Sequence, residues 1–319
     1  MRAIQVTELG QTSYTKDAAR PEPAAGQVLI AIKACALNFA DLLMVKGSYQ
    51  EKPELPFSPG MEVAGEVVAL GEGVAEPALG TRVAVFGGHG GLAEFGVFPA
   101  QLCVPLPDEM DFRTAAAFQV AYSTSHVALD YRAGLKEGET LLVLGAAGGV
   151  GLTAVELGKL MGATVIAAAR GADKLAVAAQ HGADHLIDTD KDNLRDIVKS
   201  LGGADVVYDP VGGALFTEAL RSCKPEARVL TIGFASGDVP QIAANHLLVK
   251  NVSVLGFYWG GYLAFKPSVL TDSLSALFEM YIAGTLTPHI SHELPLEQAI
   301  DGLELLRSRK STGKIVITL

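Results

Sequence analysis

Residues 141–170, LLVLGAAGGVGLTAVELGKLMGATVIAAAR, restrict the possible fold of this chain more than any other stretch. An apolar run enters a glycine-rich turn at 145–151, and a helical pattern then leads to Gly162 and a second apolar run. Strand, glycine turn, helix and strand within about 30 residues form the context in which such a turn binds a dinucleotide. Backbone N–H groups at the start of the helix can approach a pyrophosphate closely. The residues expected to do so are Ala147, Gly148, Gly149, Val150 and Gly151.

The turn reads Ala146-x-Gly148-x-x-Gly151, which departs by one position from the usual three-glycine pattern. Taken alone, it is equally compatible with an ordinary tight turn between two elements. Its position between a strand and a helix is what favours dinucleotide binding.

The end of the second strand indicates which dinucleotide is bound. NAD sites usually carry Asp or Glu about 20 residues after the turn, where the carboxylate accepts a hydrogen bond from the ribose 2′-OH. This chain has Arg170 there, with Lys174 one helical turn further on. A guanidinium and a second cation suit a 2′-phosphate, so the sequence predicts NADPH. The alternative is that both are solvated surface cations, and Asp173 between them is a mild counter-signal.

Composition excludes several classes of protein. The chain has 319 residues, enough for two domains, and a net charge of −10, which argues against general nucleic-acid binding. Three widely spaced cysteines indicate reduced thiols in a cytoplasmic protein. No apolar run is long enough to span a membrane, and the N-terminus has no signal-peptide pattern. We therefore expect no nucleic-acid partner and no membrane association.

The pattern of predicted secondary structure changes along the chain. Residues 1–115 contain short β-rich runs separated by Pro and Gly clusters, which predicts a mostly antiparallel β domain. Residues 116–261 alternate strands with helices, as in a doubly wound parallel sheet. Residues 262–319 lack this alternation, so we expect them to return to the first domain and make the middle domain an insertion. The six strand candidates of the middle domain are 141–144, 164–168, 185–187, 205–208, 228–232 and 252–255.

Two loops follow consecutive strands of that predicted sheet. They are Asp209-Pro210-Val211-Gly212-Gly213 and Gly233-Phe234-Ala235-Ser236-Gly237. Ligands of parallel sheets lie beyond the carboxyl ends of the strands. The residues Gly233, Phe234, Ala235 and Ser236 are therefore expected near the ribose and nicotinamide, although each loop alone is also compatible with a simple turn.

These motifs together resemble the zinc-independent medium-chain dehydrogenases/reductases, specifically the quinone oxidoreductase group related to ζ-crystallin. The other matching segments are Asn38–Asp41, Gly47-Ser48-Tyr49, Pro59–Gly65 and Thr312-Gly313-Lys314. The resemblance covers essentially the whole chain. It implies a GroES-like catalytic domain with an inserted Rossmann domain, NADPH as cofactor and a homodimer. It also implies that Lys314 lines the cofactor site, with a surface cation as the alternative.

The resemblance also bears on metal chemistry. Related zinc alcohol dehydrogenases use Cys, His and Cys as catalytic ligands, and the matching positions here are Asn38, Met61 and Val120. That set does not suit zinc, so we expect no metal. Without a metal to polarise a carbonyl, good hydride acceptors such as quinones and activated alkenes are the expected substrates.

Such a reaction needs donors for the developing oxyanion. Asn38 and Tyr49 are the catalytic candidates, because both can donate hydrogen bonds and a tyrosine in the Gly-x-Tyr motif is catalytic in similar enoyl-thioester reductases. The alternative is that Asn38 caps a helix beginning at Phe39 and that Tyr49 only packs.

The sequence thus favours an NADPH-dependent quinone reductase. Reduction of α,β-unsaturated carbonyls or enoyl thioesters is the first alternative. A non-enzymatic NADPH-binding protein, structural or RNA-binding, is the second.

Overall fold

The computed structural model describes residues 1–319, and the chain divides into two compact units. The first unit comprises residues 1–120 and 288–319, and the second comprises residues 121–287. The α/β architecture expected from the sequence is present, with a β-rich unit formed by both ends of the chain and a doubly wound unit inserted between them.

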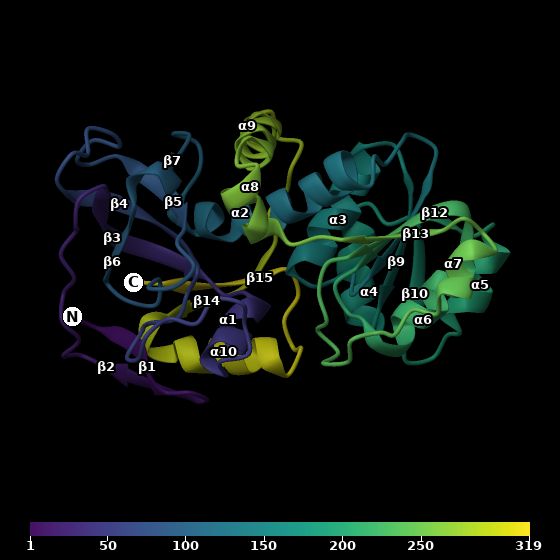
Figure 1. Ribbon diagram of the computed structural model, residues 1–319, viewed down its shortest axis with the longest axis horizontal. Coiled ribbons are helices and arrows are strands. Elements are labelled where there is room, and N and C mark those ends of the chain that lie inside the picture. The colour runs from purple at the N-terminus through teal and green to yellow at the C-terminus, as the bar shows by residue number, and fades with distance from the viewer. The chain divides into compact units, whose positions relative to one another are not determined.

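The first unit is built on a seven-stranded sheet and a separate two-stranded ribbon (Figure 1). Its strands are β1 (Ala3–Glu8), β2 (Gln11–Thr15), β3 (Gln27–Ala36), β4 (Glu62–Leu70), β5 (Arg82–Phe86), β6 (Phe95–Pro99), β7 (Cys103–Pro105), β14 (Ile290–Pro295) and β15 (Lys314–Thr318). The helices of this unit are α1 (Phe39–Val45) and α10 (Ala299–Arg307), with 3-10 turns at Ala100–Leu102 and Leu296–Gln298.

The strand β3 organises this sheet. All of one edge pairs antiparallel with β4, while the other edge is shared by β6 at its start and β15 at its end. Every ladder of the sheet is antiparallel except the parallel pair β14–β15. The strand β14 was not expected from the sequence, because its polar residues Ser291, His292 and Glu293 conceal the strand pattern.

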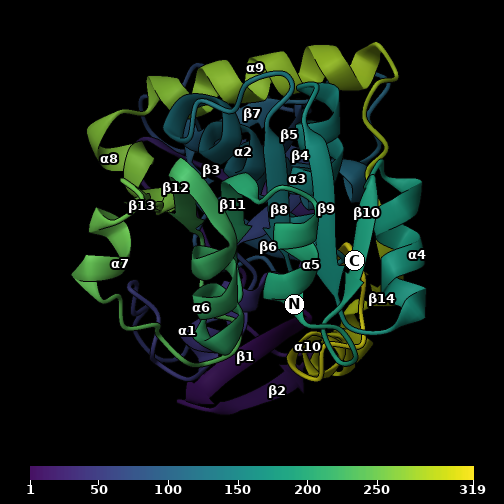
Figure 2. The same ribbon diagram turned by 90° about the vertical axis from the view of Figure 1, so that its right-hand side faces the viewer.

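The second unit contains a fully parallel six-stranded sheet in the order β10-β9-β8-β11-β12-β13 (Figure 2). The strands are β8 (Thr140–Leu144), β9 (Thr164–Ala169), β10 (His185–Asp188), β11 (Ala204–Asp209), β12 (Cys223–Thr231) and β13 (Ser253–Gly256). All six lie at the positions predicted from their apolar runs. All five residues of β8 are buried, as expected for a central strand covered on both faces.

Helices connect these strands in the order required by a doubly wound sheet. They are α3 (Gly149–Leu160), α4 (Ala172–Gln180), α5 (Leu194–Ser200), α6 (Gly213–Ser222) and α7 (Ala244–Leu248). Because the strand order runs outward from β8 in both directions, right-handed crossovers place α3 and α4 on one face and α5 and α6 on the other. The helix α3 packs very closely on the sheet, since a Cβ at Gly158 would lie 2.4 Å from Leu141 Cδ2.

The remaining helices flank this sheet unit in sequence. The helix α2 (Phe112–His126) crosses the division between the units and continues as a π-helical segment, Val127–Arg132. The helices α8 (Tyr262–Phe265) and α9 (Ser268–Ile282) follow β13. No helix of the chain combines the length and the apolar character needed to cross a bilayer.

The division between the units differs from the expected one at residues 115/116 and 261/262. Residues 262–287 belong to the second unit instead of returning to the first. The reason is a buried polar contact in which Ser273 of α9 meets Ser123 Oγ at 3.2 Å and His126 Nδ1 at 3.0 Å. Leu274 and Leu277 of the same helix are also buried, so α9 covers apolar surface of the second unit.

Candidate functional site

The glycine turn after β8 has the geometry of a phosphate-binding turn. Gly145 adopts a φ of +60°, and Gly148 is the N-cap residue of α3. A Cβ at Gly151 would lie 2.2 Å from the carbonyl oxygen of Gly145, so this position accepts only glycine. The first N–H groups of a helix have no partner within it. The N–H groups of Gly149, Val150 and Gly151 therefore remain available to an anion, beside the exposed Gly148.

The end of β9 presents an unpaired cation. Arg170 is exposed, and its guanidinium takes part in no hydrogen bond or ion pair of the structure, whereas Lys174 in the first turn of α4 is half-buried. The backbone after Arg170 is held in place, because Gly171, with φ +80°, donates its N–H to Asp188 Oδ1 at 3.0 Å. The guanidinium is thus attached to a fixed backbone and is free to bind a phosphate.

Asp188, the last residue of β10, holds the backbone that follows Arg170 and was not singled out from the sequence. The backbone N–H of Gly171, the ammonium of Lys191 and the backbone N–H of Asp190 hold the pKa of Asp188 below its usual range. Lys191 Nζ lies 3.1 Å from its carboxylate. These partners satisfy the negative charge of Asp188, which reduces its repulsion of a phosphate nearby.

The loops after β11 and β12 lie side by side at the carboxyl edge of the sheet. Ala235 donates its N–H to the carbonyl of Pro210 at 3.0 Å, and Ser236 donates to Val211 at 2.9 Å. The side chain of Phe234 is 38% exposed, and Gly233 is half-buried. The two loops predicted to contact the cofactor therefore form one connected surface.

Asp209 anchors this pair of loops. Its Oδ1 accepts the N–H groups of Val211 at 2.7 Å and Gly212 at 2.9 Å, whereas its buried Oδ2 has no partner. Burial raises the pKa of Asp209, and the two backbone donors oppose that shift. An unsatisfied buried acceptor at the carboxyl edge of the sheet is compatible with a bound group that donates a hydrogen bond there.

The first unit contains a buried polar cluster of its own. Lys314 Nζ donates to Asn38 Oδ1 at 2.7 Å and lies 3.1 Å from Glu62 Oε2. Asn38 Nδ2 in turn donates to the same Glu62 oxygen at 3.1 Å. The side chains of Lys314 and Glu62 are 7% and 0% exposed, so this is a buried ion pair closed into a triangle by an amide. Lys314 is therefore not the surface cation considered as the alternative.

Asn38 has no amide donor left for a substrate. Its Nδ2 donates to the carbonyl of Ala36 at 3.3 Å as well as to Glu62. It is also the N-cap residue of α1, where Asp41 Oδ2 accepts the Asn38 backbone N–H at 2.7 Å. The capping position considered from the sequence is thus present, and the side chain of Asn38 serves to hold Lys314.

Asp41 continues the cluster into the loop before β4. Its Oδ1 accepts the N–H of Gly60 at 3.0 Å, and the carboxyl group is fully buried. Burial raises the pKa of Asp41 to about 6, against the effect of its two backbone donors. Burial also raises the pKa of the neighbouring Cys35 thiol well above its usual value, so Cys35 stays protonated.

The positions that match the zinc ligands of related dehydrogenases converge on Glu62. Asn38 donates to one of its carboxylate oxygens, and the backbone N–H of Val120 donates to the other at 2.8 Å. Met61, the third position, directly precedes it and is 2% exposed. An amide, a thioether and an isopropyl group do not form a zinc ligand set. No group of three or more His, Cys, Asp or Glu side chains in the chain is arranged to hold a metal ion.

The structure separates the predicted residues into two groups. The turn residues, Arg170, Lys174 and the loop Gly233–Ser236 all lie in the second unit, and Asn38, Tyr49 and Lys314 lie in the first. Tyr49 is half-buried, four residues beyond the end of α1. Separate roles were predicted for Asn38 and Lys314, although the two side chains contact each other. Glu62 and Asp41 were missed as individual residues, although both lie in the motifs that were singled out.

Known families match both units. The model described as "Alcohol dehydrogenase GroES-like domain" matches residues 24–108, and the model described as "Zinc-binding dehydrogenase" matches residues 149–275. A Nematostella vectensis protein named "Quinone oxidoreductase-like protein 2 homolog" is 40% identical, over 99% of this chain and 88% of its own length.

Solved structures agree with this assignment. The quinone oxidoreductase of Thermus thermophilus, whose complex with NADPH is also known, shares 33% identity and a TM-score of 0.87 over 100% of both chains. The Escherichia coli quinone oxidoreductase complexed with NADPH shares 26% identity and a TM-score of 0.93, again over 100% of both chains.

The fold and these matches define an oxidoreductase of the medium-chain dehydrogenase/reductase class, with a GroES-like unit and an inserted Rossmann unit. Within that class, the chain belongs to the zinc-independent quinone oxidoreductase family.

Proposed function

We propose that this protein reduces quinones with NADPH, by hydride transfer from the nicotinamide. A hydride from the cofactor and a proton from solvent convert the quinone to a hydroquinone and leave NADP⁺. The observation that carries the proposal is the exposed, unpaired Arg170 at the strand end where an acid would favour NADH. NADPH complexes of the similar quinone oxidoreductases support it.

The second unit supplies the cofactor contacts in this proposal. The helix N-terminus at Gly148–Gly151, together with Ala147, binds the pyrophosphate, and Arg170 and Lys174 bind the 2′-phosphate. Gly233, Phe234, Ala235 and Ser236 lie beyond the carboxyl end of β12 and contact the ribose and nicotinamide.

The first unit supplies the polar groups for the reaction. Of the three N–H bonds of the Lys314 ammonium, two are directed to Asn38 and Glu62. We propose that the third is offered to an oxygen of the cofactor. Asn38 is a positioning residue for Lys314, and the Tyr49 phenol remains the candidate donor to the substrate oxygen.

The residues at the positions that match the zinc ligands also restrict the proposed substrate. Because Asn38, Met61 and Val120 do not suit zinc, the substrate itself must accept a hydride readily. Quinones meet this requirement.

Activated alkenes are the second candidate substrates. The segment Gly47-Ser48-Tyr49 favours them, because it resembles the tyrosine motif of enoyl-thioester reductases. Steady-state NADPH oxidation with quinones, enones and enoyl-CoA thioesters tests the choice directly. The quinone proposal predicts the highest kcat/KM with a quinone; a higher value with an enone or a thioester would replace it. NADPH binding without turnover of any acceptor would indicate a non-enzymatic NADPH-binding protein.

We also propose that the protein is a cytoplasmic homodimer. Its three cysteines are free, as is usual in a reducing compartment, and β13 is an edge strand that a second copy can extend. Sedimentation analysis tests the dimer, and a monomer at micromolar concentration would refute it.

A further inference from the structure

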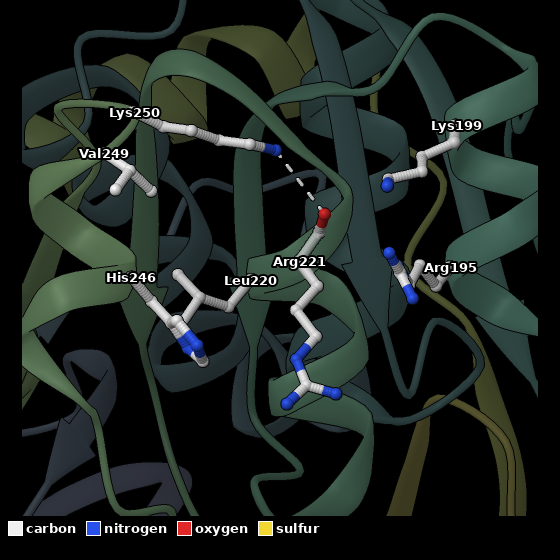
Figure 3. Close-up of a pocket in the computed structure, with 7 residues that line it drawn as sticks. All are labelled: Arg195, Lys199, Leu220, Arg221, His246, Val249 and Lys250. Carbon is white, nitrogen blue, oxygen red and sulfur yellow. Dashed lines mark hydrogen bonds between the residues drawn. The ribbon is translucent and has the colours of Figure 1, made fainter.

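A basic pocket lies on the α5/α6 side of the second unit (Figure 3). Its volume is about 310 Å³, and no carboxylate lines it. The lining residues are Arg195 and Lys199 of α5, Leu220 and Arg221 of α6, His246 of α7, and Val249 and Lys250 after it. Five of these seven side chains are basic, in a chain whose net charge is −10.

Most of this positive charge has no protein partner. Arg195, Lys199 and Arg221 are exposed, and none of their side chains takes part in a hydrogen bond or ion pair of the structure. In Figure 3 the nitrogen ends of Arg195 and Lys199 point toward the side on which Arg221 lies. Lys250 is held differently, because its Nζ donates to the carbonyl of Cys223 at 2.7 Å and lies 3.5 Å from that of Arg221.

Helix dipoles explain only part of the cluster. Lys199 and Arg221 lie in the last turns of α5 and α6, where a cation is favoured. Arg195 lies in the first turn of α5, where a cation is disfavoured. It is also four residues from Lys199, a spacing at which like charges destabilise a helix. Asp196 in the same turn offsets the dipole, but the Arg195 side chain has no hydrogen bond or ion pair of its own, and an anion between the helices would supply one.

The pocket is distinct from the predicted cofactor contacts. The last turn of α6 leads into the start of β12, and Lys250 precedes the start of β13. These are amino ends of parallel strands, whereas the glycine turn, Arg170 and the loop at 233–237 follow carboxyl ends. Arg221 and Lys250 therefore lie at the opposite end of the strands from the predicted cofactor contacts, whereas Arg195, in the first turn of α5, follows the carboxyl end of β10.

We propose that this pocket binds a small phosphate-bearing metabolite, such as a phosphomonoester or a pyrophosphate. Two guanidinium groups can each bind phosphate oxygens in a bidentate manner, while Lys199 and His246 add donors at the rim. The volume of about 310 Å³ is at the lower end of the range for small-molecule sites, which favours a compact ligand. The acidic balance of the whole chain disfavours a long polyanion such as RNA. This inference does not depend on the proposed reaction.

Calorimetric titration with inorganic pyrophosphate tests the site. The full-length protein is first saturated with NADPH, so that pyrophosphate cannot report on the cofactor turn. We expect one site per chain, and the double variant Arg195→Gln/Arg221→Gln should bind at least about tenfold more weakly. The matched control Lys16→Gln/Lys136→Gln removes the same charge from two exposed lysines elsewhere and should bind as the unmodified protein does.

Three results would overturn the proposal. The first is the absence of saturable binding, and the second is an equal loss of affinity in the control variant, which would indicate a general charge effect. The third is tighter binding of a 20-nucleotide RNA that is lost in the Arg195/Arg221 variant, which would make the pocket part of a polyanion surface. The proposal is supported only if pyrophosphate binding is lost selectively.

Discussion

Two cations of this molecule illustrate opposite uses of positive charge. Lys314 in the first unit is buried and directed to Glu62 and Asn38, whereas Arg170 in the second unit is exposed and has no protein partner. A buried charge must be compensated by the protein, because leaving it unpaired is very costly. An exposed charge is solvated by water, so it can remain without a protein partner and still bind a ligand. The environment of a cation, more than its type, therefore decides whether the protein itself must compensate the charge.

The largest expected effect comes from breaking the buried pair. Replacing Glu62 with Ala removes the carboxylate that is paired with the buried Lys314 ammonium, so the free energy of unfolding should fall by about 3–5 kcal/mol. Urea unfolding monitored by circular dichroism measures this. The double variant Glu62→Gln/Lys314→Met removes both charges and should recover most of the loss. If the single and double variants are equally destabilised, charge compensation is not what Glu62 provides.

The next largest effect concerns the exposed cation. Arg170→Asp should raise the KM for NADPH by about 10- to 100-fold and leave the KM for NADH almost unchanged, because only NADPH carries the 2′-phosphate. The free energy of unfolding should stay within about 0.5 kcal/mol, since the exposed Arg170 side chain has no hydrogen bond or ion pair to lose. Equal losses for both cofactors would remove the assigned role of Arg170. Lys136→Gln, an exposed cation of the same unit, serves as the control.

The stability contributed by Asp41 of the buried cluster should also depend on pH. The pKa of Asp41 is raised to about 6 from 3.8, so between these values the folded state binds more protons than the unfolded state. The stabilisation from this proton is present at low pH and is lost as pH rises through about 6.

The stability difference between the unmodified protein and Asp41→Asn should therefore shrink by about 1 kcal/mol from about pH 5 to about pH 8. Chemical unfolding of both proteins across this pH range measures it. A difference that grows with pH would mean that the backbone donors of Asn38 and Gly60 outweigh burial.

The smallest expected effect is at Tyr49. Tyr49→Phe should lower kcat/KM for quinones about three- to tenfold, the value of one hydrogen bond to the substrate oxygen, without changing the KM for NADPH. Stopped-flow NADPH oxidation measures this, and Tyr14→Phe removes a phenol of the same unit as a control. Unchanged turnover with every acceptor would leave Tyr49 with a packing role.

The sequence was most informative where the signal is local. The strands β8 to β13 were predicted from apolar runs, because a parallel sheet covered on both faces buries every residue of its central strands. The turn at 145–151 was predicted because the φ of +60° at Gly145 and the close approach at Gly151 require glycine. The strand β14 was missed because its half-buried residues do not alternate clearly, and pairing with β15 defines it.

At the candidate site, contacts between residues far apart in the sequence were likewise not predicted. Asn38 was predicted as a substrate donor, but its amide is occupied by Ala36 and Glu62. No residue near Asn38 in the sequence indicates that Lys314, 276 positions later, donates a hydrogen bond to the side-chain oxygen of Asn38. The basic pocket was not predicted at all, because Arg195, Arg221 and Lys250 are isolated surface cations in the sequence.

The sequence by itself determined the order of strands and helices in the inserted unit, the glycine turn after β8, and the presence of Arg170 instead of an acid after β9. Each of these depends on neighbours within about 30 residues, whose side-chain periodicity and glycine positions are read directly. The tertiary structure decided the placement of α9 in the second unit, the Lys314–Glu62–Asn38 triangle and the convergence of cations between α5 and α6. These depend on which distant surfaces become buried together, because burial is what gives a charge its partner or leaves it without one.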